Sequence, residues 1–277
     1  MFFFQCALAA EAKPLISALS LRKDTNPCPY DTYFAEDSSC VLAISGIGSL
    51  TGASSATYLL TRFGFRSESD FFINFGSCAG KNPGLYLINK ITDSTTGRTF
   101  YPDMLYDLSS CGLPASSENA LVTVDKIVSS LEDPASLYDM EASGIYQAAS
   151  HFLSPHRILF LKYVSDSGVK DVKAITREYL TECAQKQIPS VLSVMEKLKD
   201  ACDDDSAFDE ELFLSTALAL RASETMRHEL AQLFRFAKAE DLPIEEILDS
   251  LHEEGLIPAA SKREGKVVID ELKKRLI

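Results

Sequence analysis

Apolar runs that end in small or polar residues recur along the first part of the chain. They occupy residues 2–9, 40–48, 71–80 and 157–168, and each is short enough to be a single buried strand. Segments with the length and composition of helices lie between them, as in "LTGASSATYLLTRFG" and "DMEASGIYQAASHFL". Strands that alternate with helices predict an α/β sheet covered by helices on both faces. In such sheets ligands gather at the carboxyl ends of the strands, so we look for a site in the residues that follow each run.

The pattern changes in the last quarter of the chain. A run of three aspartates at 203–205 indicates a linker or an exposed connection, and the sequence beyond it has helical periodicity. Two apolar helix faces are predicted there, the second beginning after Pro243 and ending at Gly255. Their residues are Met226, Leu230, Leu233, Phe234 and Ala237, and then Ile244, Ile247, Leu248 and Leu251. We therefore expect two domains, a larger one at 1–202 and a small helical extension at 203–277.

Composition and charge narrow the class of protein. With 277 residues, 46% of them hydrophobic, the chain can bury a sizeable core. A formal net charge of -13 argues against general binding to nucleic acid, which proteins hold through clustered Lys and Arg. Because Glu11 and Lys13 follow the N-terminal run at once, we interpret that run as a first strand and not as a signal peptide. No apolar run reaches the roughly 18 residues of a membrane span, and we expect no membrane association.

The cysteines and glycines indicate neither a metal nor an organic cofactor. Seven cysteines are scattered without CxxC pairs or His-Cys metal spacing, which favours free thiols in a reducing cytoplasm. The glycines of "SGIGSLTGAS" (Gly46, Gly48 and Gly52) fit neither the dinucleotide fingerprint nor the phosphate-binding loop. They let backbone amides approach a ligand at a helix N-terminus, although a plain tight turn explains them equally well.

At two strand ends, small residues stand beside a side chain that can react, a thiol in one case and a carboxyl group in the other. In "NFGSCAG", Ser77 and Cys78 follow an apolar strand, and the small residues leave room for a flat ligand. No histidine is paired with Cys78, so we do not expect a catalytic thiol. In "VSDSG", Ser165 and Asp166 end a buried strand, where a carboxyl group is costly unless it is hydrogen-bonded or used for proton donation. The alternative is that this pair caps a helix at 170–183.

Two acids begin predicted helices. In "YDMEASGIYQAA", Met140 pairs an apolar surface with Glu141, whose carboxylate can accept hydrogen bonds from two neighbouring hydroxyls, as a ribose diol requires. An ordinary first-turn acid is the alternative interpretation. Glu11 in "ALAAEAKPLI" stands just past the first strand, at the sheet edge where the other motifs are expected.

Taken in order, five motifs resemble the nucleoside phosphorylase and nucleosidase superfamily. They are "AAEAKPLI", "SGIGSLTGASSATYLL", "NFGSCAG", "DMEASGIY" and "VSDSG", and they are closest to those of the methylthioadenosine/S-adenosylhomocysteine nucleosidases. The resemblance covers roughly residues 2–200 and leaves the helical extension unexplained. It implies a three-layer α/β/α sandwich with a central mixed sheet, and hydrolysis of the N-glycosidic bond of a purine nucleoside without a cofactor.

The resemblance also implies a role for each matching residue. Asp166 matches the acid that protonates the leaving purine, Ser165 lies beside it, and Glu11 matches the glutamate that activates water in the hydrolytic members. Glu141 and Met140 match the residues that hold the ribose. The further binding residues implied are Gly46, Ser77, Cys78 and Val128.

Two other functions are weighed against hydrolysis. Phosphorylases of this superfamily place arginines around a phosphate, whereas this chain has Glu11 and Asn74 at the corresponding positions. A carboxylate there repels a phosphate dianion, so we favour hydrolysis, with Arg98 or Lys81 as candidate phosphate ligands in the rival case. The other rival is a nucleoside-binding module that acts through its helical extension without turnover.

The expected partners follow from the same resemblance. Members of this superfamily usually form homodimers or larger homo-oligomers whose neighbours close the pocket, and residues 91–117 should contribute to the substrate tail pocket and to a dimer contact. The apolar faces of the extension suggest a protein partner, although packing of those faces within the chain is the commoner outcome.

Overall fold

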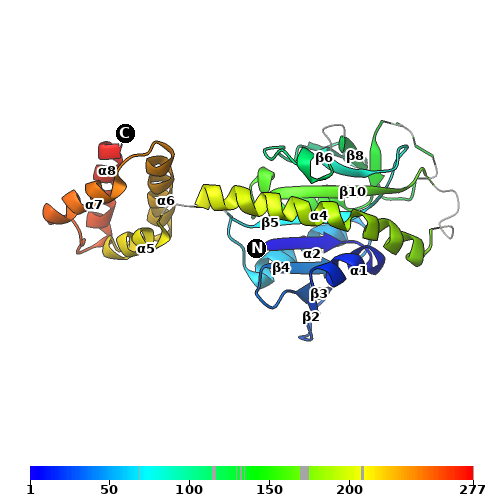
Figure 1. Ribbon diagram of the computed structural model, residues 1–277, viewed down its shortest axis with the longest axis horizontal. Helices are drawn as coiled ribbons and strands as arrows, with labels where there is room; N and C mark the ends of the chain where they lie inside the picture. The colour runs from blue at the N-terminus through cyan, green and yellow to red at the C-terminus, as the bar shows by residue number, and fades with distance from the viewer. Residues whose placement is uncertain are drawn as a thin grey trace. The chain divides into compact units, whose positions relative to one another are not determined.

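The computed structural model describes residues 1–67, 69–113, 117–128, 130–131, 133, 135–168, 175–206 and 209–276. The chain forms two compact units, an N-terminal unit of Met1–Lys199 and a C-terminal unit of Asp200–Ile277. Each unit is described by itself below (Figure 1).

One mixed sheet of ten strands forms the centre of the N-terminal unit. The sheet runs in the order β10-β6-β8-β9-β5-β1-β4-β3-β2, with β7 paired to β6, and a further pairing of β10 with β5 joins its two parts. Strands β1, β4, β5 and β10 are parallel to their partners within this group, so their carboxyl ends meet at one edge. The strands are β1 (Phe2–Cys6), β2 (Arg22–Lys23), β3 (Asp31–Phe34), β4 (Cys40–Ile44), β5 (Phe71–Ala79), β6 (Leu85–Asp93), β7 (Thr99–Phe100), β8 (Glu118–Thr123), β9 (Leu137–Asp139) and β10 (Ile158–Asp166).

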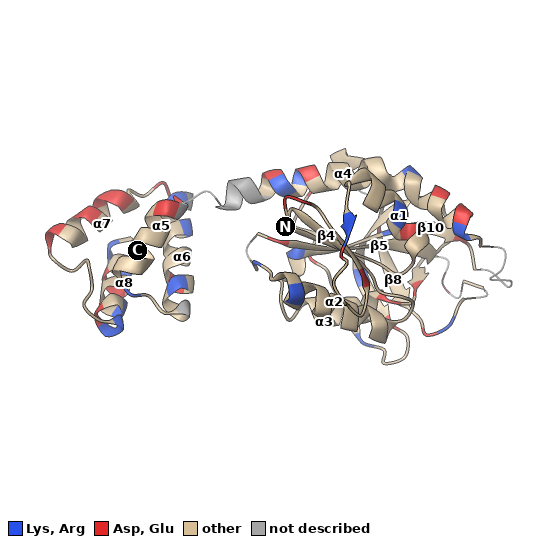
Figure 2. Ribbon diagram, turned by 90° about the horizontal axis from the view of Figure 1, so that it is seen from below, with Lys and Arg blue, Asp and Glu red and all other residues tan. Residues whose placement is uncertain are grey.

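Helices cover the sheet on both sides. Figure 2 shows α1 (Ala9–Ala18) and α4 (Arg177–Ser206) on one face of the sheet, and α2 (Ser49–Phe63) and α3 (Ala142–Ala149) on the other. Two short 3-10 segments, Ser109–Cys111 and Pro155–Arg157, lie in the connections. The predicted three-layer α/β/α sandwich with a central mixed sheet is therefore confirmed.

The four predicted apolar runs all form buried strands of this sheet. They become β1, β4, β5 and β10, whose side chains supply much of the core, with Phe3, Phe72 and Phe160 fully buried. The predicted helix at 50–64 is confirmed as α2. The predicted helix at 139–153 is shorter than expected, because the chain before it is committed to strand β9.

The expected linker at 203–205 is instead the end of a long helix. Helix α4 extends for 30 residues through Ser206 and contains the three aspartates. Its buried positions recur at helical spacing, as at Leu180, Ala184, Val191 and Leu198. Once such a helix is anchored, each added residue gains a backbone hydrogen bond, so a polar terminal turn can continue it.

The C-terminal unit has an apolar core of its own. Its helices after α4 are α5 (Glu210–Ala219), α6 (Glu224–Ala239), α7 (Ile244–Glu253) and α8 (Lys262–Leu276). Both predicted apolar faces lie in this core, on α6 and α7. As predicted, α7 follows Pro243, and its end is marked by Gly255 with φ of +71°. Across the described residues, no helix is long and apolar enough to cross a membrane.

Candidate functional site

The carboxyl ends of several strands surround one cavity of about 230 Å³. Eight of the nine residues predicted for a site line it, although they come from distant parts of the sequence. They are Glu11, Ser77, Cys78, Val128, Met140, Glu141, Ser165 and Asp166. Gly46 does not line the cavity, but its neighbour Ile47 does. With φ of +83°, Gly46 turns the loop after β4, and its N–H donates to the carbonyl of Ala7 at 3.0 Å.

Glu11 is buried at the start of α1 and its carboxylate is held by three hydrogen bonds. Oε1 accepts from the N–H of Ser77 at 2.8 Å and from its hydroxyl at 2.7 Å, while Oε2 accepts from the N–H of Leu8 at 2.9 Å. Gly76 lies so close that a Cβ there would stand 3.3 Å from Oε1. The three bonds fix the orientation of the carboxylate and leave acceptor capacity on Oε2 toward the cavity.

Glu141 is the N-cap residue of α3 and lines the same cavity. Its Oε1 accepts from the N–H of Gly48 at 2.9 Å, which is how the glycine loop after β4 takes part in the site. Burial, and then repulsion from Asp139, raises the pKa of Glu141 to about 7, although Lys162 and the Gly48 N–H lower it. Small changes of pH near neutrality therefore change the charge of this side chain.

A buried ion pair between Lys162 and the lining residue Asp139 was not predicted from the sequence. Nζ of Lys162 lies 2.9 Å from Oδ2 of Asp139, and both side chains are almost fully buried. Burial alone would lower the pKa of Lys162, but Asp139 and Glu141 raise it above its usual value. Asp139 also accepts hydrogen bonds from the hydroxyl of Thr123 at 2.8 Å and from the N–H of Ala142 at 2.9 Å. The lysine inside the apolar run "ILFLKYV" was a signal, because a charge on a buried strand needs a partner.

Ser165 and Asp166 form a compact pair at the end of β10. The hydroxyl of Ser165 donates to Oδ2 of Asp166 at 2.9 Å, and the N–H of Gly168 donates to Oδ1 at 2.9 Å. The alternative was that this pair caps a helix at 170–183, and the described helix in this region, α4, begins at Arg177. Residues 169–174 lie outside the described part of the chain.

Cys78 lines the cavity but is not arranged as a nucleophile. Its thiol points to the carbonyl of Tyr163 at 3.5 Å, and burial raises the pKa of the thiol far above neutrality. A protonated thiol with a carbonyl acceptor is a packing group. The prediction that Cys78 is not a catalytic thiol agrees with this geometry.

Apolar side chains make up much of the remaining wall. They are Ala7, Leu8, Ile47, Val124, Ile127, Val128, Met140, Ile175 and Leu180. Among the described lining residues there is no Lys or Arg. Four carboxylates line the cavity, and one of them, Asp139, is paired with Lys162. Such a largely apolar cavity with acceptor groups suits a neutral ligand that has a flat ring and hydroxyl groups.

The cations considered as phosphate ligands lie elsewhere. Arg98 is exposed, donates to the side chain of Gln147 at 3.0 Å and stacks over Phe100. Lys81 is exposed too, and neither residue lines the cavity. Asn74 is buried in β5, where its Nδ2 donates to the carbonyl of Gln5 at 3.0 Å.

The fold of the N-terminal unit is that of enzymes that cleave nucleosides. A 5'-methylthioadenosine nucleosidase of Arabidopsis thaliana matches with a TM-score of 0.60 and 19% identity over 71% of this chain and 95% of that one. A methylthioadenosine/S-adenosylhomocysteine nucleosidase of Colwellia psychrerythraea, solved with adenine, matches at 0.58 and 21% over 71% and 95%. Futalosine hydrolase of Helicobacter pylori matches at 0.57 and 14% over 70% and 97%.

The chain is also similar in sequence to one curated protein. A 5'-methylthioadenosine/S-adenosylhomocysteine nucleosidase of Bacillus pumilus is 32% identical over 142 residues, which are 49% of this chain and 58% of the relative. The match thus spans less than two thirds of that relative's length. No model of a protein family matches the chain. The predicted resemblance to the methylthioadenosine/S-adenosylhomocysteine nucleosidases is confirmed.

Proposed function

We propose that the N-terminal unit hydrolyses the N-glycosidic bond of a purine nucleoside of the methylthioadenosine or adenosylhomocysteine kind. The observation that carries this proposal is that Glu11, Glu141 and Asp166 line one largely apolar cavity. The three side chains come from three strand ends and are each held by hydrogen bonds. The likeness to nucleosidases in fold and in part of the sequence supports the same function.

Each carboxyl group suits one requirement of the reaction. Asp166 gives a proton to the ring of the purine, so that the base leaves C1′ as a neutral molecule and the ribosyl group becomes oxocarbenium-like. Glu11 accepts a proton from the water that attacks C1′, through the acceptor capacity left on Oε2. Glu141, in its ionised form, accepts hydrogen bonds from the ribose hydroxyls and fixes the sugar between the other two groups. The products are the free base and the ribosyl sugar.

The surroundings of Glu11 favour water over phosphate as the second substrate. The carboxylate is 2% exposed and no described cation lines the cavity, so a phosphate dianion would meet an uncompensated negative charge. Phosphorolysis is the second candidate, and it predicts that turnover requires phosphate. Ser77, which donates twice to Glu11, is a positioning residue in this scheme.

The proposal is tested on the residue that serves the leaving group. Asp166→Asn should lower the release of adenine from methylthioadenosine and adenosylhomocysteine by a factor of about 100 or more, because general acid catalysis typically contributes that much. The matched control is Asp37→Asn, which alters an exposed aspartate that accepts hydrogen bonds from Ser39, two residues further on, and lies outside the cavity. The control should keep the activity of the unchanged protein. Equal activity of Asp166→Asn and the unchanged protein would refute the assignment.

We also propose that the N-terminal unit works as a homo-oligomer in the cytoplasm. Large apolar side chains are exposed on the cavity lining, with Ile47 at 54% and Ile127 at 52%, and in the first turn of α2, with Leu50 at 84%. A second copy that covers them would bury this apolar surface and shield the cavity from bulk solvent. The six described cysteines that are free suit a reducing compartment. Sedimentation equilibrium of Leu50→Arg, which should reduce the mass to that of a smaller species, tests the contact.

A further inference from the structure

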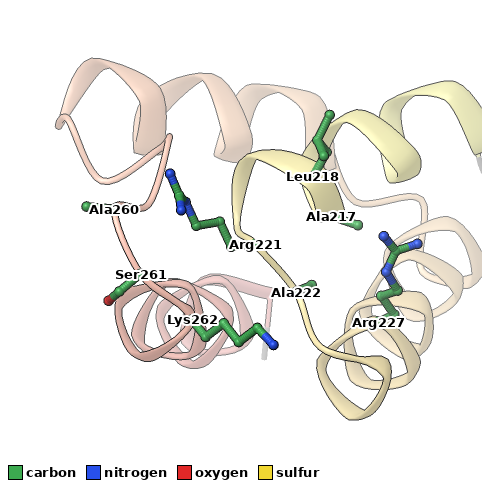
Figure 3. Close-up of a pocket in the computed structure, with 8 residues that line it drawn as sticks. All are labelled: Ala217, Leu218, Arg221, Ala222, Arg227, Ala260, Ser261 and Lys262. Atoms are coloured by element: carbon green, nitrogen blue, oxygen red, sulfur yellow. The ribbon is translucent and has the colours of Figure 1, made fainter.

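Two grooves of opposite charge flank helix α5 in the C-terminal unit. The first, which we call the basic groove, is a cavity of about 710 Å³ bounded by Arg221, Arg227 and Lys262, with Leu218 and small residues between them. Figure 3 shows these side chains arranged around the end of α5 and the loop that leads into α6. The second, the acidic groove, is a cavity of about 310 Å³ with Glu245 and Asp249 of α7 on its wall.

The charged residues of the two grooves are not neutralised within the described part of the unit. Elsewhere in this unit, charges pair with one another, as Lys266 does with Glu229 and Arg275 with Glu254. Among the described residues, no ion pair is recorded for the three cations of the basic groove, or for Glu245 and Asp249. The basic groove therefore concentrates positive charge in a chain whose formal net charge is -13.

The packing of the backbone builds the basic groove. Gly265 brings the first turn of α8 so close to α5 that a Cβ there would stand 1.9 Å from the carbonyl oxygen of Leu220. The N–H of Ala259 also donates to the carbonyl of Ala219 at 3.0 Å. These contacts place Lys262, at the start of α8, beside the end of α5, where Arg221 has a φ of +50°.

Exposed apolar side chains of α5 lie beside the charged residues of the basic groove. Leu218, 75% exposed, lines the basic groove, and Leu214, 49% exposed, lies one turn earlier. The acidic groove has apolar residues on its floor, Leu212, Ala219 and Leu248. Figure 2 shows Asp and Glu residues repeated along α7, which forms one side of that groove. Each groove thus offers the charge that the other lacks, together with apolar surface.

We propose that C-terminal units of two copies of this chain join head to tail, with Glu245 and Asp249 of one copy entering the basic groove of the other. The contact is heterologous, so each joined unit keeps one free groove and can add a further copy. It is separate from the contact proposed for the N-terminal unit and does not depend on nucleoside hydrolysis. Because charge pairs at a surface drive it, the association is weak and sensitive to salt.

Complementary charge reversals test the proposal in the full chain. Arg227→Glu blocks the basic groove and leaves the acidic groove intact, and Asp249→Lys does the reverse. Fluorescence anisotropy measures the association of a labelled variant with an unlabelled one. Mixing the two variants should give association at least about tenfold tighter than mixing either variant with itself, and 0.5 M NaCl should remove the difference. Any contact through the N-terminal units contributes equally to all these mixtures.

Controls and opposing outcomes make the test decisive. Lys273→Glu reverses an exposed charge on α8 outside both grooves, and it should associate with itself as the unchanged protein does. Circular dichroism and nucleosidase activity should be the same in all variants. A mixed pair that binds no more tightly than the self-mixtures would overturn the proposal. A second outcome would also overturn it: tripolyphosphate stabilises the unchanged protein but not Arg227→Glu, and no association is seen. The basic groove would then be a site for a small anion.

Discussion

Replacing Lys162 by Met tests how the buried charges behind the cavity support the site. The substitution keeps the length and apolar stem of the side chain but removes the cation 2.9 Å from Oδ2 of Asp139. Asp139 then remains buried as a carboxylate with only its hydrogen bonds from Thr123 and Ala142. Glu141 loses the nearby positive charge that lowers its pKa.

The expected loss of stability is large. Removing one partner of a buried ion pair typically costs about 3–5 kcal/mol, because the other charge stays buried without compensation. With a urea dependence of about 3 kcal/mol per M, the midpoint of unfolding should fall by roughly 1–1.7 M. Asp139→Asn in the same chain should recover much of this loss, because the amide removes the uncompensated buried charge and its oxygen can still accept from the N–H of Ala142.

Urea unfolding of the two single variants and the double variant measures the coupling between Lys162 and Asp139. We expect an interaction free energy of at least about 2 kcal/mol. The pH profile of kcat/KM for Lys162→Met should also shift its acid limb to higher pH, since Glu141 ionises less readily without the lysine. If the two substitutions add within about 0.5 kcal/mol and the acid limb stays in place, the buried pair does not support the site as we describe.

Three further predictions follow from the same geometry. Because the ionised form of Glu141 is the one that accepts the ribose hydroxyls and its pKa is about 7, kcat/KM should fall about tenfold between pH 8 and pH 6, and this limb should be absent in Glu141→Gln. Folding raises the pKa of Glu141, so the stability that this residue contributes is complete below pH 4.5 and is lost as the pH rises through 7. In urea unfolding, the unchanged protein should therefore lose about 3 kcal/mol of stability by pH 8 relative to Glu141→Gln. Gly76→Ala places a methyl group 3.3 Å from Oε1 of Glu11 and so disturbs the position of this carboxylate. The substitution should lower kcat about tenfold or more with little change in KM. Equal effects on kcat and KM would indicate a general loss of structure.

The sequence predicts best those elements in which consecutive residues are apolar because all of them are buried. The strands β1, β4, β5 and β10 are continuous apolar runs because both of their faces are covered by helices. In contrast, β6 and β8 have mixed burial and no such run, and their existence depends on pairing with each other and with neighbours distant in sequence. The short strand β9 replaces the expected start of a helix for the same reason, since it is held by β8 and by Ala79 of β5.

The candidate site divides in a similar way. Motif residues that follow strands could be gathered from the sequence because parallel strands bring their carboxyl ends to one edge, and eight of the nine line the cavity. The exception, Gly46, contributes backbone geometry to the neighbouring loop. The pairing of Lys162 with Asp139 could not be predicted, because it joins two strands that are not neighbours in the sheet. The end of α4 was missed because three aspartates usually favour exposed connections, whereas an anchored helix can extend through them.

Identification of the sugar product tests nucleoside hydrolysis most directly. The protein is incubated with methylthioadenosine and with adenosylhomocysteine, with and without phosphate, and the released molecules are identified by mass spectrometry. We expect adenine and the free ribosyl sugar at the same rate under both conditions, and no release by Glu11→Gln. Release only in the presence of phosphate, with a sugar 1-phosphate as product, would contradict hydrolysis and with it the role proposed for Glu11.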